Sequence, residues 1–137
     1  MISPQWVEGL SVGVPRMDRQ HRRMVELVNQ VIAALEQGDD GAADHALAAL
    51  TAHARHHFAA EEALIAACGV PAAECDAHRA EHRLLLGEVE ALRRLDGDWP
   101  DRENAIALLS KWAMRHIIEH DLAYRPYAIG HPAAEET

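Results

Sequence analysis

The segment His57-Phe58-Ala59-Ala60-Glu61 decides the fold that we expect for this chain. It lies within residues 42–67, which contain neither proline nor glycine, so we expect one long helix there. Residues four apart share a face of a helix, so the imidazole of His57 and the carboxylate of Glu61 point the same way. Apolar residues mark that direction as the buried side: Leu50, Leu64 and Ile65. A histidine and a carboxylate buried together need polar partners.

The rest of the chain predicts an all-α fold. Apolar side chains recur every three or four residues in four segments, and short turns rich in glycine, proline or aspartate separate these segments. Helices joined by short turns favour an antiparallel up-down-up-down four-helix bundle. We expect a single domain over residues 1–137, with an extended N-terminal arm (1–17), the bundle (about 18–125) and a loose C-terminal tail (about 128–137). The expected helices are 18–37 with Asp18 as N-cap, 42–67, 72–95, and about Pro100 to at least Asp121.

Composition excludes several classes of partner. The formal net charge of the 137 residues is −9, which argues against nucleic acid or an anionic membrane. No apolar run reaches 18 residues, and the first residues do not resemble a secretory signal. The two cysteines, Cys68 and Cys75, are too few for a disulfide framework and lack the C-x-x-C spacing of a redox pair. We therefore expect a cytoplasmic protein with two unrelated thiols.

Ten histidines stand out in this chain, and several of them fall at matching heights in the expected bundle. His21 and His57 lie at equal distances in sequence from Asp39, the centre of the first expected turn, and antiparallel helices bring such positions level. The same argument at the second and third turns adds further polar side chains at this level. With His57 and Glu61, the three turns together bring five polar residues to one level: His21, His78, His82, His116 and Asp121.

Five imidazoles and two carboxylates are too many ligands for one metal ion. A tetrahedral zinc site takes four ligands, and calcium or magnesium prefers oxygen. The donor set suits two first-row transition ions, and iron suits oxygen chemistry best. No glutamate is followed by a histidine three residues later, so the chain lacks the Glu-x-x-His motif of ferritin-like bundles. The alternative is a helical bundle that binds no metal. His53 lies one turn before His57, and we interpret it either as a hydrogen-bonded core histidine or as a residue that supports the ligands.

At these positions the sequence resembles the bacterial hemerythrins, relatives of the di-iron oxygen carriers of marine invertebrates. The resemblance runs from about Trp6 to Tyr127. The matching motifs are Val12-Gly13-Val14, Met17-Asp18-Arg19-Gln20-His21, His57-Phe58-Ala59-Ala60-Glu61-Glu62, His78-Arg79-Ala80-Glu81-His82 and His116-Ile117-Ile118-Glu119-His120-Asp121, with Tyr124 after them.

The resemblance implies a function and a cofactor, namely reversible dioxygen binding at a non-haem di-iron centre rather than an enzymatic activity. Two iron ions per chain, with a bridging oxo or hydroxo group, are then expected. One iron takes His78, His82 and His116, the other takes His21 and His57, and Glu61 and Asp121 bridge them. Dioxygen, or azide or a similar small anion, binds at the open position of the two-histidine iron. The positions that line the oxygen pocket in relatives correspond here to Phe58, Trp112 and Ile118.

Three points stay open at this level. A di-iron enzyme that reduces peroxide or consumes oxygen, or an iron-handling or repair protein, could use the same fold, and an oxygen-using protein partner is possible. Asp121 lies five residues after His116, about 140° away on an ideal helix, so His120 is better placed geometrically. We nevertheless choose Asp121, because a bridge between two cations favours a carboxylate, and we expect a π-type turn or a loosened helix near residues 118–121.

Overall fold

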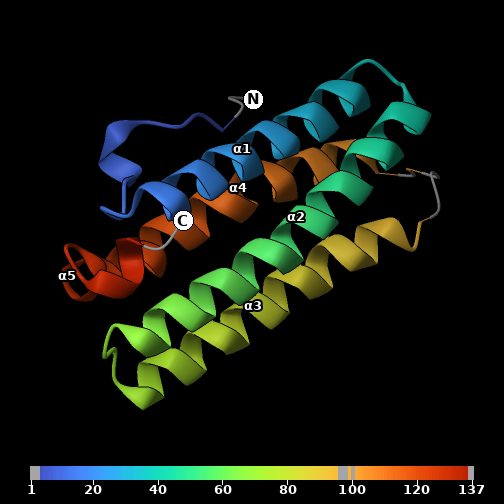
Figure 1. Ribbon diagram of the computed structural model, residues 1–137. Helices are drawn as coiled ribbons and strands as arrows, with labels where there is room; N and C mark the ends of the chain where they lie inside the picture. The colour runs from blue at the N-terminus through green and yellow to red at the C-terminus, as the bar shows by residue number, and fades with distance from the viewer. Residues whose placement is uncertain (1–3, 96–98, 100, 136–137) are drawn as a thin grey trace.

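The computed structural model describes residues 4–95, 99 and 101–135, and the regular secondary structure in these residues is helical. Successive long helices run antiparallel, α1 packs against α2 and α4, and α2 packs against α3 (Figure 1). The expected four-helix bundle is therefore confirmed. The long helices are α1 (Pro15–Glu36), α2 (Asp40–Ala67), α3 (Ala72–Arg93) and α4 (Arg102–Glu119).

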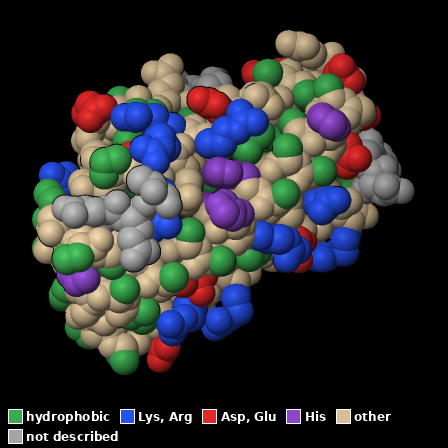
Figure 2. All heavy atoms as spheres, viewed as in Figure 1, with side chains coloured by type: hydrophobic (Ala, Val, Ile, Leu, Met, Phe, Trp, Pro, Cys, Tyr) green, Lys and Arg blue, Asp and Glu red, His purple; other side chains and the backbone are tan. Residues whose placement is uncertain are grey.

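Aspartate caps fix the starts of two of these helices. The side chain of Asp39 accepts a hydrogen bond of 3.0 Å from the backbone N–H of Ala42, and Asp101 accepts one of 3.0 Å from Asn104. Pro100, expected at the start of the fourth helix, lies outside the described residues. Within the described part of the chain, none of the helices is both long and apolar enough to cross a membrane. On the face shown in Figure 2, acidic and basic side chains are interspersed, with histidines exposed near its middle.

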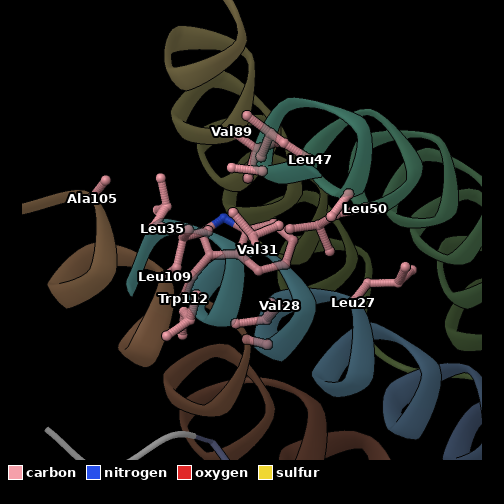
Figure 3. Close-up of a cluster of buried hydrophobic side chains, with 14 of the residues drawn as sticks. Leu27, Val28, Val31, Leu35, Leu47, Leu50, Val89, Ala105, Leu109 and Trp112 are labelled. Carbon is pink, nitrogen blue, oxygen red and sulfur yellow. The ribbon is translucent and has the colours of Figure 1, made fainter. Parts of the chain in front are cut away.

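Two hydrophobic clusters divide the interior of the bundle. The larger cluster lies between the four long helices, and Figure 3 shows part of it, with Trp112 among aliphatic side chains of α1 and α2. The smaller cluster joins the N-terminal arm to the end of α2 and to the segments after α4. On α1, His21 lies between Met24 of the larger cluster and Met17 of the smaller one. His21 is therefore enclosed by hydrophobic packing on both sides.

The first helix starts three residues earlier than expected. α1 begins at Pro15, since the missing N–H of proline costs nothing at the first position of a helix. Asp18 is consequently not the N-cap but lies in the first turn, where its carboxylate accepts hydrogen bonds from Ser11 Oγ (2.6 Å) and from the backbone N–H of Val12 (2.9 Å). These bonds tie the arm to α1. Gly13 has φ +77°, and a Cβ there would approach Ile129 to 3.1 Å, so a side chain would both strain the backbone and crowd this contact.

The C-terminal part of the chain folds back on the bundle. α4 ends at Glu119 and is followed by the 3-10 helix η2 (Asp121–Tyr124), the short helix α5 (Arg125–Ala128) and the 3-10 helix η3 (Pro132–Glu135). Ala128 is fully buried and Ala134 is 7% exposed, both in the smaller cluster. The expectation of a loose tail is therefore wrong for the described residues, because alanines there pack against the arm and α2. Residues 136 and 137 lie outside the described part.

Candidate metal centre

All seven predicted ligands lie together inside the bundle. None is more than 7% exposed, so the chain buries five imidazoles and two carboxylates at one level. α1 and α2 contribute His21, His57 and Glu61; α3, α4 and η2 contribute His78, His82, His116 and Asp121.

One oxygen of Glu61 faces the histidines of α1 and α2. Its Oε2 lies 3.0 Å from Nε2 of His21 and 3.4 Å from Nε2 of His57. Tyr124 donates a hydrogen bond of 2.9 Å to the same oxygen. Burial and the neighbouring carboxylates raise the pKa of Tyr124 well above its usual value, so its hydroxyl remains a donor at neutral pH.

The other oxygen of Glu61 faces the remaining histidines. Its Oε1 lies 3.1 Å from Nε2 of His78, 3.0 Å from Nε2 of His82 and 3.9 Å from Nε2 of His116. A single carboxylate thus divides five imidazoles into a group of two and a group of three.

Asp121 repeats this division with its own two oxygens. Its Oδ2 lies 3.1 Å from Nε2 of His21, while Oδ1 lies 3.0 Å from Nε2 of His78 and 2.9 Å from Nε2 of His116. In each of two groups, the potential ligand atoms all lie within 4.8 Å of one another. The groups are His21, His57, Glu61 and Asp121, and Glu61, His78, His82, His116 and Asp121. Both carboxylates belong to both groups, as a pair of bridging ligands must.

A break in the helix brings Asp121 to His116. The backbone at His120 leaves the helical region (φ −121°, ψ −50°), and Asp121 begins η2. The expected loosening of the helix is present, and it takes the form of a 3-10 segment instead of a π-type turn. His120 itself is 36% exposed and lies outside both groups.

The pKa values of the histidines and of Glu61 are shifted by burial and by their mutual contacts in the metal-free protein. Burial lowers the pKa of His21, but hydrogen bonds to Asp121 and Glu61 outweigh burial and raise the pKa to about 10. The same balance raises the pKa of His78 to about 10 and that of His116 to about 9. Burial dominates for His57 and lowers its pKa. Burial alone raises the pKa of Glu61, yet the surrounding imidazoles bring it well below its usual value.

Hydrogen bonding within the chain leaves several buried atoms of this cluster unpaired. Buried polar atoms are normally hydrogen-bonded, and leaving one unpaired costs about 1–3 kcal/mol. Among the described residues, two such atoms, His21 Nδ1 and His116 Nδ1, have no hydrogen-bond partner. Four more make no well-aligned hydrogen bond and take part only in the close contacts given above: His57 Nε2, His116 Nε2, Asp121 Oδ1 and Asp121 Oδ2. Nitrogen and carboxylate donors in this arrangement fit a pair of first-row transition ions.

Two residues that sequence reasoning missed orient these imidazoles. Gln20 Oε1 lies 2.6 Å from Nδ1 of His57, and Glu62 Oε2 lies 2.9 Å from Nδ1 of His82. Each contact places the proton on Nδ1 and leaves Nε2 free for a metal ion. Gln20 directly precedes His21 and Glu62 directly follows Glu61 in the sequence, but each contacts a histidine on a neighbouring helix. His53 is satisfied by the backbone carbonyl oxygen of Gln20, 2.9 Å from its Nε2.

Two of the three residues predicted to line an oxygen pocket are buried. Phe58 is 1% exposed and stacks on the ring of His82, with centroids 4.0 Å apart, and Trp112 is 4% exposed. Ile118, in contrast, is 55% exposed, so its placement in a buried pocket wall is wrong. It lies two residues after His116, about 200° around the helix, and therefore faces away from the centre. Ile117 is the fully buried isoleucine of this pair.

The two cysteines are free and buried, as expected for unrelated thiols. Cys75 donates a weak hydrogen bond of 3.4 Å to the carbonyl oxygen of Val70. Both side chains belong to the smaller hydrophobic cluster, where they fill space between α2 and α3.

Comparisons with known proteins identify the family to which this chain is similar. Residues 12–128 match the family model described as the hemerythrin HHE cation binding domain. The chain is 28% identical over 127 residues to a bacteriohemerythrin of Stenotrophomonas maltophilia, covering 92% of this chain and 82% of that protein. It is 33% identical over 115 residues to a bacteriohemerythrin of Ralstonia nicotianae, covering 82% and 80%. A crystal structure of a leucine-to-phenylalanine mutant superposes with a TM-score of 0.83 at 25% identity, covering 95% of this chain and all of that one. The chain therefore belongs to the hemerythrin family.

Proposed function

We propose that this protein binds dioxygen reversibly at a non-haem di-iron centre. One observation carries the proposal: two buried carboxylates each direct one oxygen to His21 and the other to the group containing His78. That arrangement matches two metal ions bridged by Glu61 and Asp121. The names of the relatives, which are bacteriohemerythrins, support the choice of iron and dioxygen.

The seven residues have separate roles in this proposal. His78, His82 and His116 would hold one iron, and His21 and His57 would hold the other, with an oxo or hydroxo group completing the centre. Two ferrous ions held in this way would supply the electrons and the open coordination position that dioxygen needs. Because His21 and His57 offer fewer imidazoles than the other group, the ion that they would hold is the one that would keep a position open for dioxygen.

The protein around the centre controls water and protons. Phe58 covers one face of His82, and Trp112 lies against Phe58 with ring centroids 6.2 Å apart. The indole N–H of Trp112 donates to the carbonyl oxygen of Leu85 at 3.0 Å, so this polar atom is satisfied away from the centre. A dry lining slows the arrival of protons and the loss of a reduced product, which favours reversible binding over turnover.

Tyr124 contacts the Glu61 carboxylate through its hydroxyl, and its ring lies 6.0 Å from that of His78. Its hydroxyl donates a hydrogen bond to Glu61 Oε2. The same oxygen also lies close to the imidazole of His21. A hydrogen bond of this kind fixes the orientation of a ligating carboxylate. We expect the same contact to hold Glu61 in place whether or not dioxygen is bound.

An optical titration tests this function. Protein reconstituted with ferrous iron without air should gain a visible charge-transfer band on exposure to dioxygen and lose it when the gas is removed. Repeated cycles should return the same spectra. If the starting spectrum is not recovered when the gas is removed, and peroxide or dioxygen is consumed, reversible binding is contradicted and a di-iron enzyme is favoured.

A further inference from the structure

A third group of potential metal ligands connects the surface to the buried centre. One carboxylate oxygen of Glu81, one ring nitrogen of His116 and one ring nitrogen of His120 all lie within 4.8 Å of one another. The side chains of Glu81 and His120 are 25% and 36% exposed, with Glu81 Oε1 3.8 Å from His120 Nε2. The side chain of His116 is fully buried. This group therefore spans the distance from solvent to a residue of the centre.

A cavity beside His120 leads to another residue of the centre. It has a volume of about 210 Å³ and lies between α3 and the segment that follows α4. His78 lines it, and His78 has the most exposed side chain of the seven, at 8%. The carboxylates among its lining residues are Glu74 and Glu119, and Arg115 pairs with Glu119 at 3.1 Å. The cavity therefore brings solvent close to His78.

His116 is common to the outer and the inner group. Its Nε2 lies 2.9 Å from Asp121 Oδ1, whereas its Nδ1 has no hydrogen-bond partner among the described residues. One nitrogen of this imidazole is therefore not engaged by the inner carboxylates. The outer group offers three ligand atoms from Glu81, His116 and His120, whereas the inner group offers five. An ion bound at the surface thus gains ligands as it moves inward, and this difference sets the direction of transfer.

We propose that Glu81 and His120 form a capture site for a divalent first-row transition ion, which then passes to His116 and into the buried centre. One carboxylate and two imidazoles are suitable ligands for such ions. The ion keeps its charge during this ligand exchange, and no electron transfer is involved. The proposal rests on the metal centre described under the proposed function.

Kinetics of metal uptake test the capture site. Metal-free protein is mixed with Co²⁺, which resists oxidation under these conditions and whose visible absorption reports binding. The test variant is Glu81→Gln with His120→Gln. The control is Glu36→Gln with His45→Gln, which removes the same groups from exposed positions. Glu36 lies 15 residues beyond His21 on α1, about 22 Å along the helix.

The expected result separates rate from capacity. The test variant should load about tenfold more slowly than the control, consistent with lost electrostatic and ligand capture, and both should reach the same final ratio of metal to protein. Equal loading rates would overturn the capture site. A lower final ratio in the test variant alone would also overturn it, because Glu81 and His120 would then belong to the permanent centre. If the unaltered protein took up no metal, the proposed metal centre itself would fail.

Discussion

Glu62→Gln should weaken metal binding at the three-histidine ion. In the native protein the carboxylate of Glu62 accepts the Nδ1–H of His82 at 2.9 Å and so increases the basicity of Nε2. The variant keeps the shape and the acceptor oxygen but loses the charge. His57, in contrast, has the neutral acceptor Gln20 at 2.6 Å. Gln20→Glu is therefore the reciprocal change.

The magnitude follows from the strength of the two kinds of hydrogen bond. A hydrogen bond to a charged group contributes about 1.5–3 kcal/mol, and a neutral one contributes about 0.5–1.5 kcal/mol. The side chain of Glu62 is 27% exposed, so solvent screening brings the difference to the lower end, about 1 kcal/mol. This corresponds to a loss of about fivefold in the affinity for the metal ion that His82 would hold.

Competition with a chelator of known affinity measures both variants. Glu62→Gln should lower the affinity, and Gln20→Glu should raise it by a similar factor. Arg79→Gln is the control, because Arg79 Nε lies 3.7 Å from Glu62 Oε1 and its interaction with the site runs through this exposed ion pair. Its loss should change the affinity by less than about twofold. Unchanged affinity in Glu62→Gln, with the fold intact by circular dichroism, would refute the reasoning.

Three further predictions concern stability. Ile117→Ala should lower the free energy of unfolding by about 2–5 kcal/mol in a denaturant titration, because Ile117 is buried. Ile118→Ala should lower it by less than about 0.5 kcal/mol, because Ile118 is exposed. Equal losses would show that Ile118 is as buried as Ile117. Metal loading should raise the melting temperature by several degrees, since metal binds the folded chain more tightly than the unfolded one, and coincident melting curves would show that the bundle does not need its centre. For metal-free protein, the raised pKa values of His21, His78 and His116 give stability that is complete below about pH 6.5 and lost as pH rises through 9–10; denaturant titrations at pH 6.5 and pH 10 test this, and a more stable protein at pH 10 would contradict it.

Helical spacing explains why the bundle and the meeting of seven polar residues could be predicted from sequence. His57 and Glu61 share a helix face at a separation of four, and the apolar residues beside them show that the face is buried. Short turns then fix the antiparallel order, and antiparallel order fixes which residues are level. His21 and His57 meet across α1 and α2 for this reason, with ring centroids 4.6 Å apart.

Contacts that depend on irregular backbone or on the rotation of a helix are harder to predict from the sequence. The close approach of His116 and Asp121 needs the break at His120, which the helical repeat alone does not predict. Gln20 and Glu62 reach histidines on neighbouring helices, and no spacing rule within one helix connects those pairs. Ile118 occupies a pocket-lining position in relatives, but in this chain the helical repeat puts it about 200° from His116, on the exposed side of α4.

The amount of iron bound per chain tests the central claim most directly. Metal-free protein is reconstituted with excess ferrous iron without air, freed of unbound metal, and analysed for iron and protein. Two carboxylates that each face both histidine groups predict two irons per chain. One iron per chain, or a preference for a single zinc ion when both metals are offered, would contradict the bridged di-iron centre.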